Sequence, residues 1–357
     1  MVVAKAGREK DPTRELTFFV PSLFHQVCHP FSSTKSIFRF VQSIPTSVQH
    51  ISFAVGPFHV VALPPTPAPD STTSNDPSLP SNDELAASAP ISDDSSQPPI
   101  HVFCLPGLED TVQVSTSFVR AGMDFFTSEY GSYPFTTFNL VFVDEPIVSS
   151  SAGAAMAIFD SDLLHPKEII DQAYETRLVL SHALAFQWIG INIVPKTWSD
   201  TWLINGLSLY ITGLFLRKLL GNNEYRFRLK MDSIRCAEMD DGSQAPICLP
   251  GSLDPPDAAT LPFVNLKSGL VLHILDRRLG KTGTSLGLSR VIPKIFLSAI
   301  TGDLANNALS TQTFLRMCRK VSGVDIGVDI GASLGISASL DLAILAKIDN
   351  IANDGKR

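Results

Sequence analysis

A segment rich in proline, serine and acidic residues divides this chain of 357 residues into two parts. Residues 63–100 contain nine prolines and six acidic residues but no lysine or arginine. A segment of this composition buries too little apolar surface to offset the entropy lost on ordering. We therefore predict that residues 63–100 form a disordered insertion and that the chain folds on either side of it.

The rest of the composition is that of a folded protein with few exposed charges. Hydrophobic residues make up 44% of the chain and charged residues 18%, and the formal net charge is -7. An acidic chain is a poor candidate for a protein whose main task is to neutralise phosphates. The most apolar stretch, 202–216, is shorter than the roughly 18–20 residues that span a bilayer, so no membrane contact is predicted. Five cysteines without a C-x-x-C pair predict reduced thiols of an intracellular protein.

Residues 1–62, before the insertion, are rich in strand-forming residues. The stretch 51–63 and the stretch 37–43 are both rich in β-branched and aromatic residues. About sixty residues are too few to close a β-sandwich. We predict that residues 1–62 are the remnant of an N-terminal β-rich domain, whose strands lack partners in this chain.

The part after the insertion begins with strands and continues with helices. We predict a strand at 101–105, a helix at 111–130 and a central strand at 138–143, which is apolar on both faces. Beyond Pro166 the apolar spacing predicts helices at 166–190, 199–220, 222–239, 262–279, 286–301 and 310–321. This order favours an α+β fold. Residues 101–323 form the predicted main domain, and residues 324–357 a divergent tail without a specific site.

All three tryptophans fall in one short stretch, residues 181–210. His182 lies in the middle of a predicted helix, on an apolar stripe that includes Phe186. A lone histidine in such a stripe is usually a core residue whose hydrogen bonds are satisfied. Ser199 and Asp200 have the composition of a cap and first turn for the next helix.

This stretch resembles the zinc-site segment of the gluzincin aminopeptidases. In that family H-E-x-x-H on one helix supplies two zinc ligands and a general base, and a glutamate on the next helix is the third ligand. The surrounding residues match the family without a gap. Residues 187–190 read Q-W-I-G, residues 198–203 read W-S-D-T-W-L, and Gly206 follows the third-ligand position.

The resemblance also implies that the chemistry is lost. His182 stands at the first ligand position, but Ala183 replaces the general base, Phe186 the second histidine and Asn205 the third ligand. One imidazole and one neutral amide cannot make a tetrahedral zinc site. We therefore expect no catalytic residue, no metal and no cofactor.

Two further sequence elements of the family also lack their functional residues here. The substrate-binding G-A-M-E-N segment aligns with residues 148–152, which read V-S-S-S-A and lack the acid that binds the amine of the substrate. The tyrosine that stabilises the oxyanion aligns with Leu266. The resemblance thus implies that no small-molecule substrate is processed.

Four phrases extend the resemblance over residues 37–323: IPTSVQHISFAVGPF (44–58), FNLVFVDE (138–145), LLHPKEIID (163–171) and GNNEYRFRLK (221–230). Together and in order they are similar to the aminopeptidase-like TBP-associated factors of the general transcription factor TFIID, a catalytically degenerate branch of the same family. This implies a thermolysin-like (gluzincin) pseudo-catalytic domain, preceded by the terminal strands of a β-sandwich.

The functional implication is a non-catalytic scaffold in the nucleus that supports assembly of the RNA polymerase II pre-initiation complex. The implied partners are other TFIID subunits, including TATA-binding protein and histone-fold factors. Two alternatives remain open at this point: an active zinc metallo-aminopeptidase, and a peptide-binding module that uses the vestigial cleft.

A local excess of positive charge lies in the helical part. Residues 217–320 hold fifteen lysines and arginines against nine acidic residues. Four of these cations share one predicted helix: Arg226, Arg228, Lys230 and Arg235. They are interpreted either as a solvated helix face with pairs such as Glu224–Arg228, or as a weakly sequence-specific contact with the phosphates of core-promoter DNA.

Overall fold

The computed structural model describes strand residues 17–19, 23–28 and 36–41, followed by residues 44–65, 97–240, 244, 246–248, 254–281 and 287–323. Residues 66–96, which make up most of the predicted insertion, lie outside the described residues. The predicted tail at 324–357 also lies outside them.

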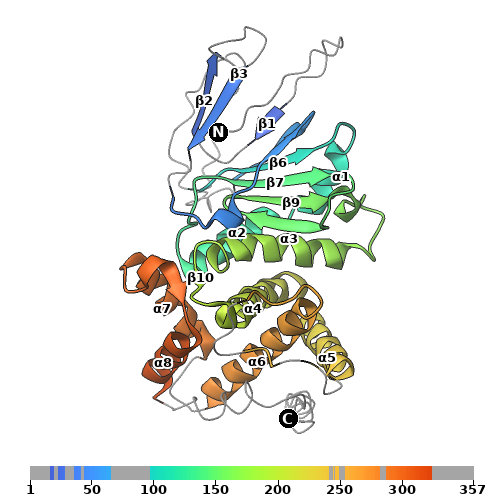
Figure 1. Ribbon diagram of the computed structural model, residues 1–357. Helices are drawn as coiled ribbons and strands as arrows, with labels where there is room; N and C mark the ends of the chain where they lie inside the picture. Colours follow the sequence, from blue (N-terminus) through green and yellow to red (C-terminus); the bar gives the residue numbers. More distant parts are fainter. Residues whose placement is uncertain are drawn as a thin grey trace, which may run out of the picture.

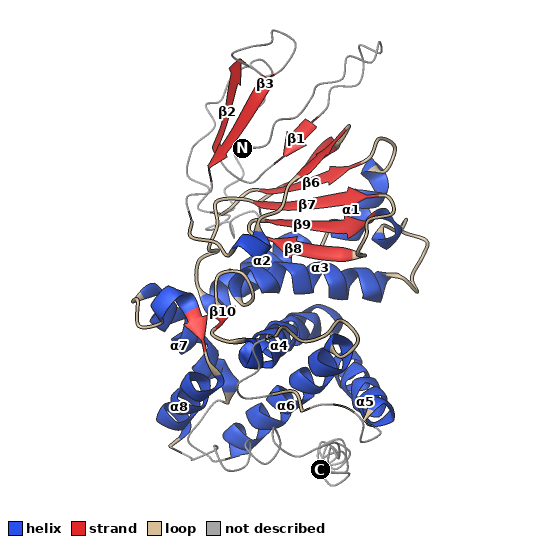
Figure 2. Cartoon of the chain, viewed as in Figure 1, coloured by secondary structure: helices blue, strands red, loops and turns tan. Residues whose placement is uncertain are grey.

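A five-stranded mixed sheet forms one layer of the molecule (Figures 1 and 2). The three inner strands run parallel, and each edge strand is antiparallel to its neighbour. In spatial order the strands are β5 (His59–Leu63), β6 (Ile100–Cys104), β7 (Phe138–Val143), β9 (Met156–Asp160) and β8 (Ser150–Gly153). The central place of β7 confirms what its two apolar faces predicted.

The pairing of β5 with β6 corrects the predicted domain boundary at residue 62. Leu63 lies opposite Ile100 in the register of this antiparallel pair. The strand expected in a separate N-terminal domain therefore belongs to the same sheet as β6. The proline-rich composition therefore does not mark the end of a domain, because a long connection between paired strands adds little closure entropy.

The other N-terminal strands also pair within the chain, contrary to the expectation that they lack partners. β1 (Thr17–Phe19) pairs with β4 (Ala54–Gly56), and β2 (Leu23–Cys28) pairs with β3 (Ser36–Val41). β4 is followed after two residues by β5, so the chain runs from the β1–β4 pair directly into the main sheet.

Three helices lie against the sheet. α1 (Glu109–Thr116) packs on β5 and β6, and α2 (Val119–Tyr130) packs on α3 (Ala173–Trp188). The sequence predicted one helix over 111–130, but the helix is interrupted by a turn at 117–118, between α1 and α2. Figure 1 shows α3 running between the sheet and the remaining helices.

The remaining helices form a second layer below α3. They are α4 (Thr201–Leu220), α5 (Asn222–Met239), α6 (Leu261–Lys281), α7 (Leu288–Ile300) and α8 (Thr311–Ser322). Each lies within two residues of its predicted bounds at both ends. By length and composition alone the helical stretch 198–220 is apolar enough to cross a membrane, but it packs against α3, α5 and α6, and 56% of its most apolar window is buried.

A buried arginine on α2 fastens the two ends of the β5–β6 connection. The Arg120 guanidinium donates hydrogen bonds to the carbonyl oxygens of Leu63 (3.1 Å), Pro64 (3.1 Å) and Pro98 (2.8 Å). Burial lowers the pKa of Arg120, because the charged form loses solvation. These bonds close the connection just outside the sheet.

Replacing Arg120 with methionine should therefore destabilise the fold. The Arg120→Met variant keeps the apolar stem but leaves three carbonyl groups without their donor, and we expect a loss of roughly 3 kcal/mol in the free energy of unfolding. Urea denaturation followed by circular dichroism measures it. The control is Arg290→Met at an exposed position on α7. Equal stability of the two variants would show that the three Arg120 hydrogen bonds contribute nothing to the free energy of unfolding.

Candidate functional site

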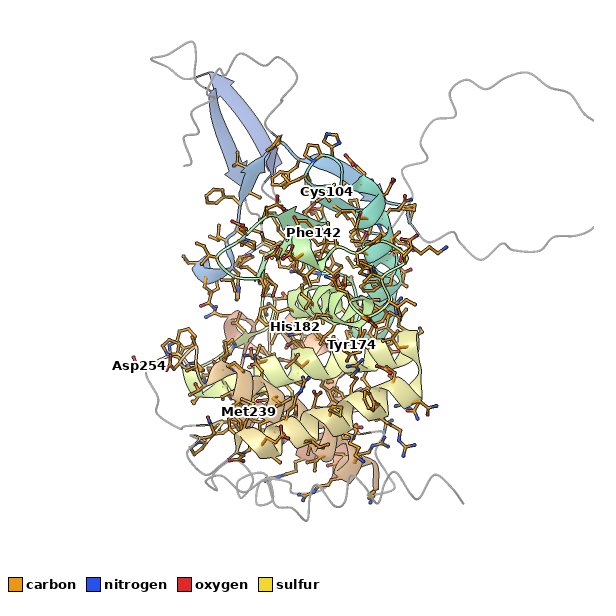
Figure 3. The ribbon with its side chains drawn as sticks, turned by 90° about the vertical axis from the view of Figure 1, so that its right-hand side faces the viewer. Cys104, Phe142, Tyr174, His182, Met239 and Asp254 are labelled. Atoms are coloured by element: carbon orange, nitrogen blue, oxygen red, sulfur yellow. The ribbon has the colours of Figure 1, made fainter. Side chains whose placement is uncertain are left out.

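The site predicted from the sequence lies where α3, α4 and α6 meet. Figure 3 shows His182 between the sheet, marked by Phe142, and the helical layer, marked by Met239. The Ser208 hydroxyl on α4 is 3.1 Å from His182 Nε2 and donates to the carbonyl of Asn205 at 2.8 Å. Asn205 Nδ2 in turn donates to Asn265 Oδ1 on α6 at 2.8 Å. A chain of polar contacts thus joins the three helices.

His182 is neutral at physiological pH. Burial lowers the pKa of its imidazole to about 4. The single O–H of Ser208 donates its hydrogen bond to the carbonyl of Asn205, so the hydroxyl oxygen accepts from His182 Nε2. The network therefore assigns the Nε2–H tautomer, in which the nitrogen facing α4 is a donor.

Phe186 packs next to His182 on the same face of α3. Its ring centroid is 5.8 Å from that of His182 and 6.1 Å from that of His50. The ring also covers Gly190, where an added Cβ would lie 2.4 Å from a ring carbon. Gly190 has a φ of +138°, so the glycine is required both for the turn and for the ring.

His50 is a residue of this site that the sequence did not predict. It lies in the short 3-10 helix η1 (Val48–His50), and its imidazole is hydrogen-bonded to the backbone of Ala152 and Gly190. Burial lowers its pKa. His50 lies in the phrase 44–58 that supports the resemblance, but nothing in that phrase indicated a site, and only the fold brings it beside Phe186.

The two predicted substrate-binding elements lie on either side of this cluster. Residues 150–152 belong to the edge strand β8, and its last residue, Gly153, faces the η1 segment. Leu266 follows Asn265, the hydrogen-bond partner of Asn205, on α6. Neither element carries the acid or the hydroxyl of an aminopeptidase.

The matching residues around the lost ligands have structural contacts of their own. Gln187 Oε1 accepts from the backbone nitrogen of Ala155 at 2.9 Å, and its Nε2 donates to the carbonyl of Gly153 at 3.1 Å. Trp188 Nε1 donates to the carbonyl of Gly131 at 3.2 Å. The Q-W pair thus holds the β8–β9 hairpin and the end of α2 on α3.

Asp200 joins the start of α4 to the start of α8. Its buried carboxylate accepts from the backbone nitrogens of Thr197 (3.2 Å) and Thr311 (2.7 Å), and Trp202 Nε1 donates to the Thr311 hydroxyl. At Gly206 an added Cβ would lie 2.9 Å from the Cβ of Ser268, so this glycine permits the close crossing of α4 and α6. These contacts need no metal.

The donor set does not fit a zinc ion. At the positions of the resemblance the chain offers one imidazole, Nε2-protonated, and one carboxamide that is bonded to another. Structural and catalytic zinc sites use at least three cysteine, histidine or carboxylate ligands. Within the described ranges no three such side chains come together in a geometry that could hold a metal.

The four basic residues lie on α5, as predicted, but on two different faces. Arg228 Nε donates to Glu224 at 2.7 Å, and its guanidinium lies 3.7 Å from the centroid of the Tyr174 ring. Arg228 and Arg235 line a pocket, whereas Arg226 and Lys230 lie half a turn away. The Glu224–Arg228 pair confirms the interpretation of a helix stabilised by i,i+4 pairs.

Comparisons with known proteins place the chain near a peptidase family and near transcription factors. The model of the peptidase family M1 domain matches residues 116–321. "Transcription initiation factor TFIID subunit 2" of Schizosaccharomyces pombe is 44% identical over 303 residues, which are 84% of this chain and 24% of that protein. The protein of the same name in Saccharomyces cerevisiae is 37% identical over 315 residues, 82% of this chain and 22% of that protein.

A more distant relative is named as an enzyme. "Aminopeptidase 2" of Candida albicans is 26% identical over 126 residues, 34% of this chain and 14% of that protein. The chain spans about a quarter of the length of the TFIID relatives it matches.

The packing of Phe186 predicts a cost for truncating it. Phe186→Ala removes a ring that contacts His182, His50 and Gly190 and leaves a cavity, so we expect a loss of about 3 kcal/mol in the free energy of unfolding. Chemical denaturation provides the value. The control is Phe53→Ala, because Phe53 is 55% exposed. If Phe186→Ala lowers the free energy of unfolding no more than Phe53→Ala does, the Phe186 ring does not fill the site.

The lowered pKa of His182 predicts a pH dependence of stability. Between its ordinary value of 6.5 and about 4 the unfolded chain binds a proton that the folded chain does not. Stability should therefore fall as the pH falls through this window. His273, whose pKa burial also lowers to about 4, acts in the same direction. The His182→Gln variant should show a shallower pH dependence than the wild type in thermal unfolding at pH 7, 6 and 5. Identical slopes would contradict the assignment.

Proposed function

The chain belongs to peptidase family M1, and we propose that it is a non-catalytic member that serves as a scaffold subunit of the general transcription factor TFIID. One observation carries the proposal. The residues that hold the helices together, such as Gln187 and Asp200, are present with their contacts, while Ala183, Phe186 and Asn205 stand where a base and two ligands are needed. A protein with this pattern retains the fold of a peptidase without its chemistry.

The same pattern supports a finer assignment of the fold. A mixed sheet with an antiparallel edge strand, followed by two helices that carry the ligand positions, is what a thermolysin-like (gluzincin) domain requires. We assign β5 and residues 100–323 to this pseudo-catalytic domain. The small sheets formed by β1 to β4 fit the terminal strands of an N-terminal β-sandwich.

The names of the relatives support the proposed assembly. The two fungal relatives that are 44% and 37% identical are both named as TFIID subunit 2. By this analogy the partners are other TFIID subunits, including TATA-binding protein and histone-fold factors. The setting is the RNA polymerase II pre-initiation complex in the nucleus. Arg226 and Lys230, on the face of α5 away from the pocket, are the candidates for weak contacts with promoter phosphates.

Affinity purification of the tagged chain from nuclear extract tests the assembly. We expect TATA-binding protein and histone-fold subunits to co-purify with it in constant proportion through a second, size-based step. Recovery of the chain alone would contradict the scaffold role. The Arg226→Gln, Lys230→Gln double variant should still co-purify, but it should lower the affinity of the complex for promoter DNA and reduce the slope of that affinity against salt.

Metal content and peptidase activity test the loss of catalysis. The purified chain should carry substoichiometric zinc after equilibration with zinc and dialysis, and should release no fluorophore from aminoacyl substrates, because it lacks the base and two ligands. Elemental analysis that finds about one zinc per chain, together with turnover, would identify an active enzyme instead.

A triple variant separates the lost ligands from the rest of the fold. Ala183→Glu, Phe186→His and Asn205→Glu together restore the residue types that bind zinc on α3 and α4, so zinc uptake is expected. The double variant without Asn205→Glu should bind zinc more weakly. Efficient peptidase activity should not return, because residues 148–152 carry no acid and Leu266 has no hydroxyl.

A further inference from the structure

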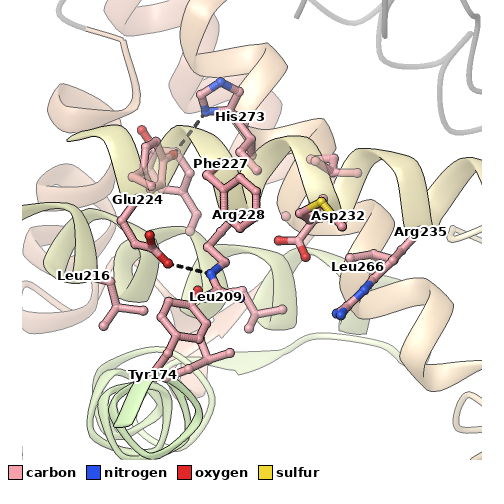
Figure 4. Close-up of a pocket in the computed structure, with 18 of the residues that line it drawn as sticks. Tyr174, Leu209, Leu216, Glu224, Phe227, Arg228, Asp232, Arg235, Leu266 and His273 are labelled. Atoms are coloured by element: carbon pink, nitrogen blue, oxygen red, sulfur yellow. Dashed lines mark hydrogen bonds and ion pairs between the residues drawn. The ribbon is translucent and has the colours of Figure 1, made fainter. Parts of the chain in front are cut away.

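A pocket of about 460 Å³ lies between α3, α4, α5 and α6 (Figure 4). Its volume is in the range of pockets that bind ligands. Seven leucines form most of the apolar part of its wall: Leu178, Leu209, Leu216, Leu220, Leu229, Leu266 and Leu270. The pocket adjoins the degenerate zinc site: His182, Phe186 and Asn205 are not among its lining residues, but Asn265 and Leu266 are.

Polar contacts near both ends of α5 hold it against the neighbouring helices. Near its start, Arg228 connects Glu224 to the Tyr174 ring on α3. Just past its last residue, the Asp240 carboxylate accepts from Lys267 Nζ on α6 at 2.9 Å, in a buried ion pair. Only Ser233 and Cys236 of α5 are fully buried. The helix therefore spans a cavity over the leucines of the neighbouring helices.

The carboxylate of Asp232 faces this cavity. Figure 4 shows Asp232 of α5 with its carboxylate between Arg228 and Leu266. Burial raises the pKa of Asp232, while the charges of Arg235 and Arg228 act in the opposite direction. In the described part of the chain neither arginine forms an ion pair with Asp232, and Arg228 is already bonded to Glu224.

The charges around the cavity favour a cation. Glu175 and Glu224 line the pocket together with Asp232, against Arg228 and Arg235. The Tyr174 and Phe227 rings also line it, but the Arg228 guanidinium already lies 3.7 Å and 5.5 Å from their centroids. An anionic ligand would meet the Asp232 carboxylate, and a wholly apolar ligand would bury it further without a partner.

We propose that this pocket binds a lysine side chain presented by a peptide segment of a partner protein. The aliphatic stem of lysine packs on the leucine wall, and its ammonium group pairs with Asp232. The pocket is larger than one side chain, and Phe227 at its wall is 52% exposed, so a large aliphatic residue beside the lysine completes the fit. This inference does not depend on the assignment to TFIID.

Peptide titrations of the full chain test the ligand class. The probe is a fluorescent, terminally blocked heptapeptide with a central lysine flanked by leucines, and binding is followed by fluorescence anisotropy. Versions with acetyl-lysine, norleucine or glutamate at the centre should bind at least about tenfold more weakly, because each lacks the charge that pairs with the carboxylate. Equal binding of the lysine and norleucine peptides overturns the proposal, as does the absence of saturable lysine-peptide binding at millimolar concentrations.

Two variants locate the binding in the pocket. Asp232→Asn keeps the shape but removes the charge, so it should weaken the lysine peptide about tenfold and leave the norleucine peptide unchanged. Gly269→Leu should block the pocket: Gly269 lines it, an added Cβ there meets nothing within 4 Å, and leucine is the better helix former.

The matched control for the blocking variant is Gly280→Leu. Gly280 lies on the same helix, an added Cβ also meets open space there, and the residue does not line the pocket. Thermal unfolding shows that both variants fold. Loss of lysine-peptide binding in Gly269→Leu with retention in Gly280→Leu supports the proposal. Equal binding by the two leucine variants overturns it. Neither result bears on co-purification with TFIID subunits, which tests the proposed function separately.

Discussion

The carboxamide of Gln187 is the contact on which the two-layer arrangement depends. It accepts a hydrogen bond from the backbone nitrogen of Ala155 and donates one to the carbonyl of Gly153, so it bonds both sides of the turn between β8 and β9. Because Gln187 is fully buried on α3, loss of these bonds would leave polar groups unsatisfied on both the helix and the hairpin. Gln187 thus fixes the β8–β9 hairpin against α3, the helix on which the second layer packs.

Around this anchor, packing and hydrogen bonds supply the connection that a metal supplies in a zinc site. A bound zinc contributes folding energy by linking the elements that carry its ligands. Here α3, α4 and α6 are linked by the contacts from His182 through Ser208 and Asn205 to Asn265, and Phe186 fills space beside them. The three helices therefore keep a fixed arrangement without an ion.

The helices and the central strand were predictable because their signals are local. Apolar spacing sets the helical stretches, and glycines such as Gly221 and Gly323 lie just past helix ends. The pairing of β5 with β6 was not predictable, because it joins residues on either side of a segment without structural signal. His50 and the pocket were missed for the same reason: chain-distant segments create them. Of the candidate site, His182, Phe186 and Asn205 were singled out from one continuous stretch, but their contacts with Ser208, His50 and Asn265 could not be predicted.

Because Arg120 bonds to both ends of the β5–β6 connection, the stability of the sheet depends little on the length of that connection. With both ends fixed at one guanidinium, each added residue changes only a logarithmic term in the closure entropy. Sequence and length between residues 66 and 96 can then diverge among relatives almost without a folding penalty. Insertions or deletions in this interval should therefore cost the β5–β6 pairing little stability.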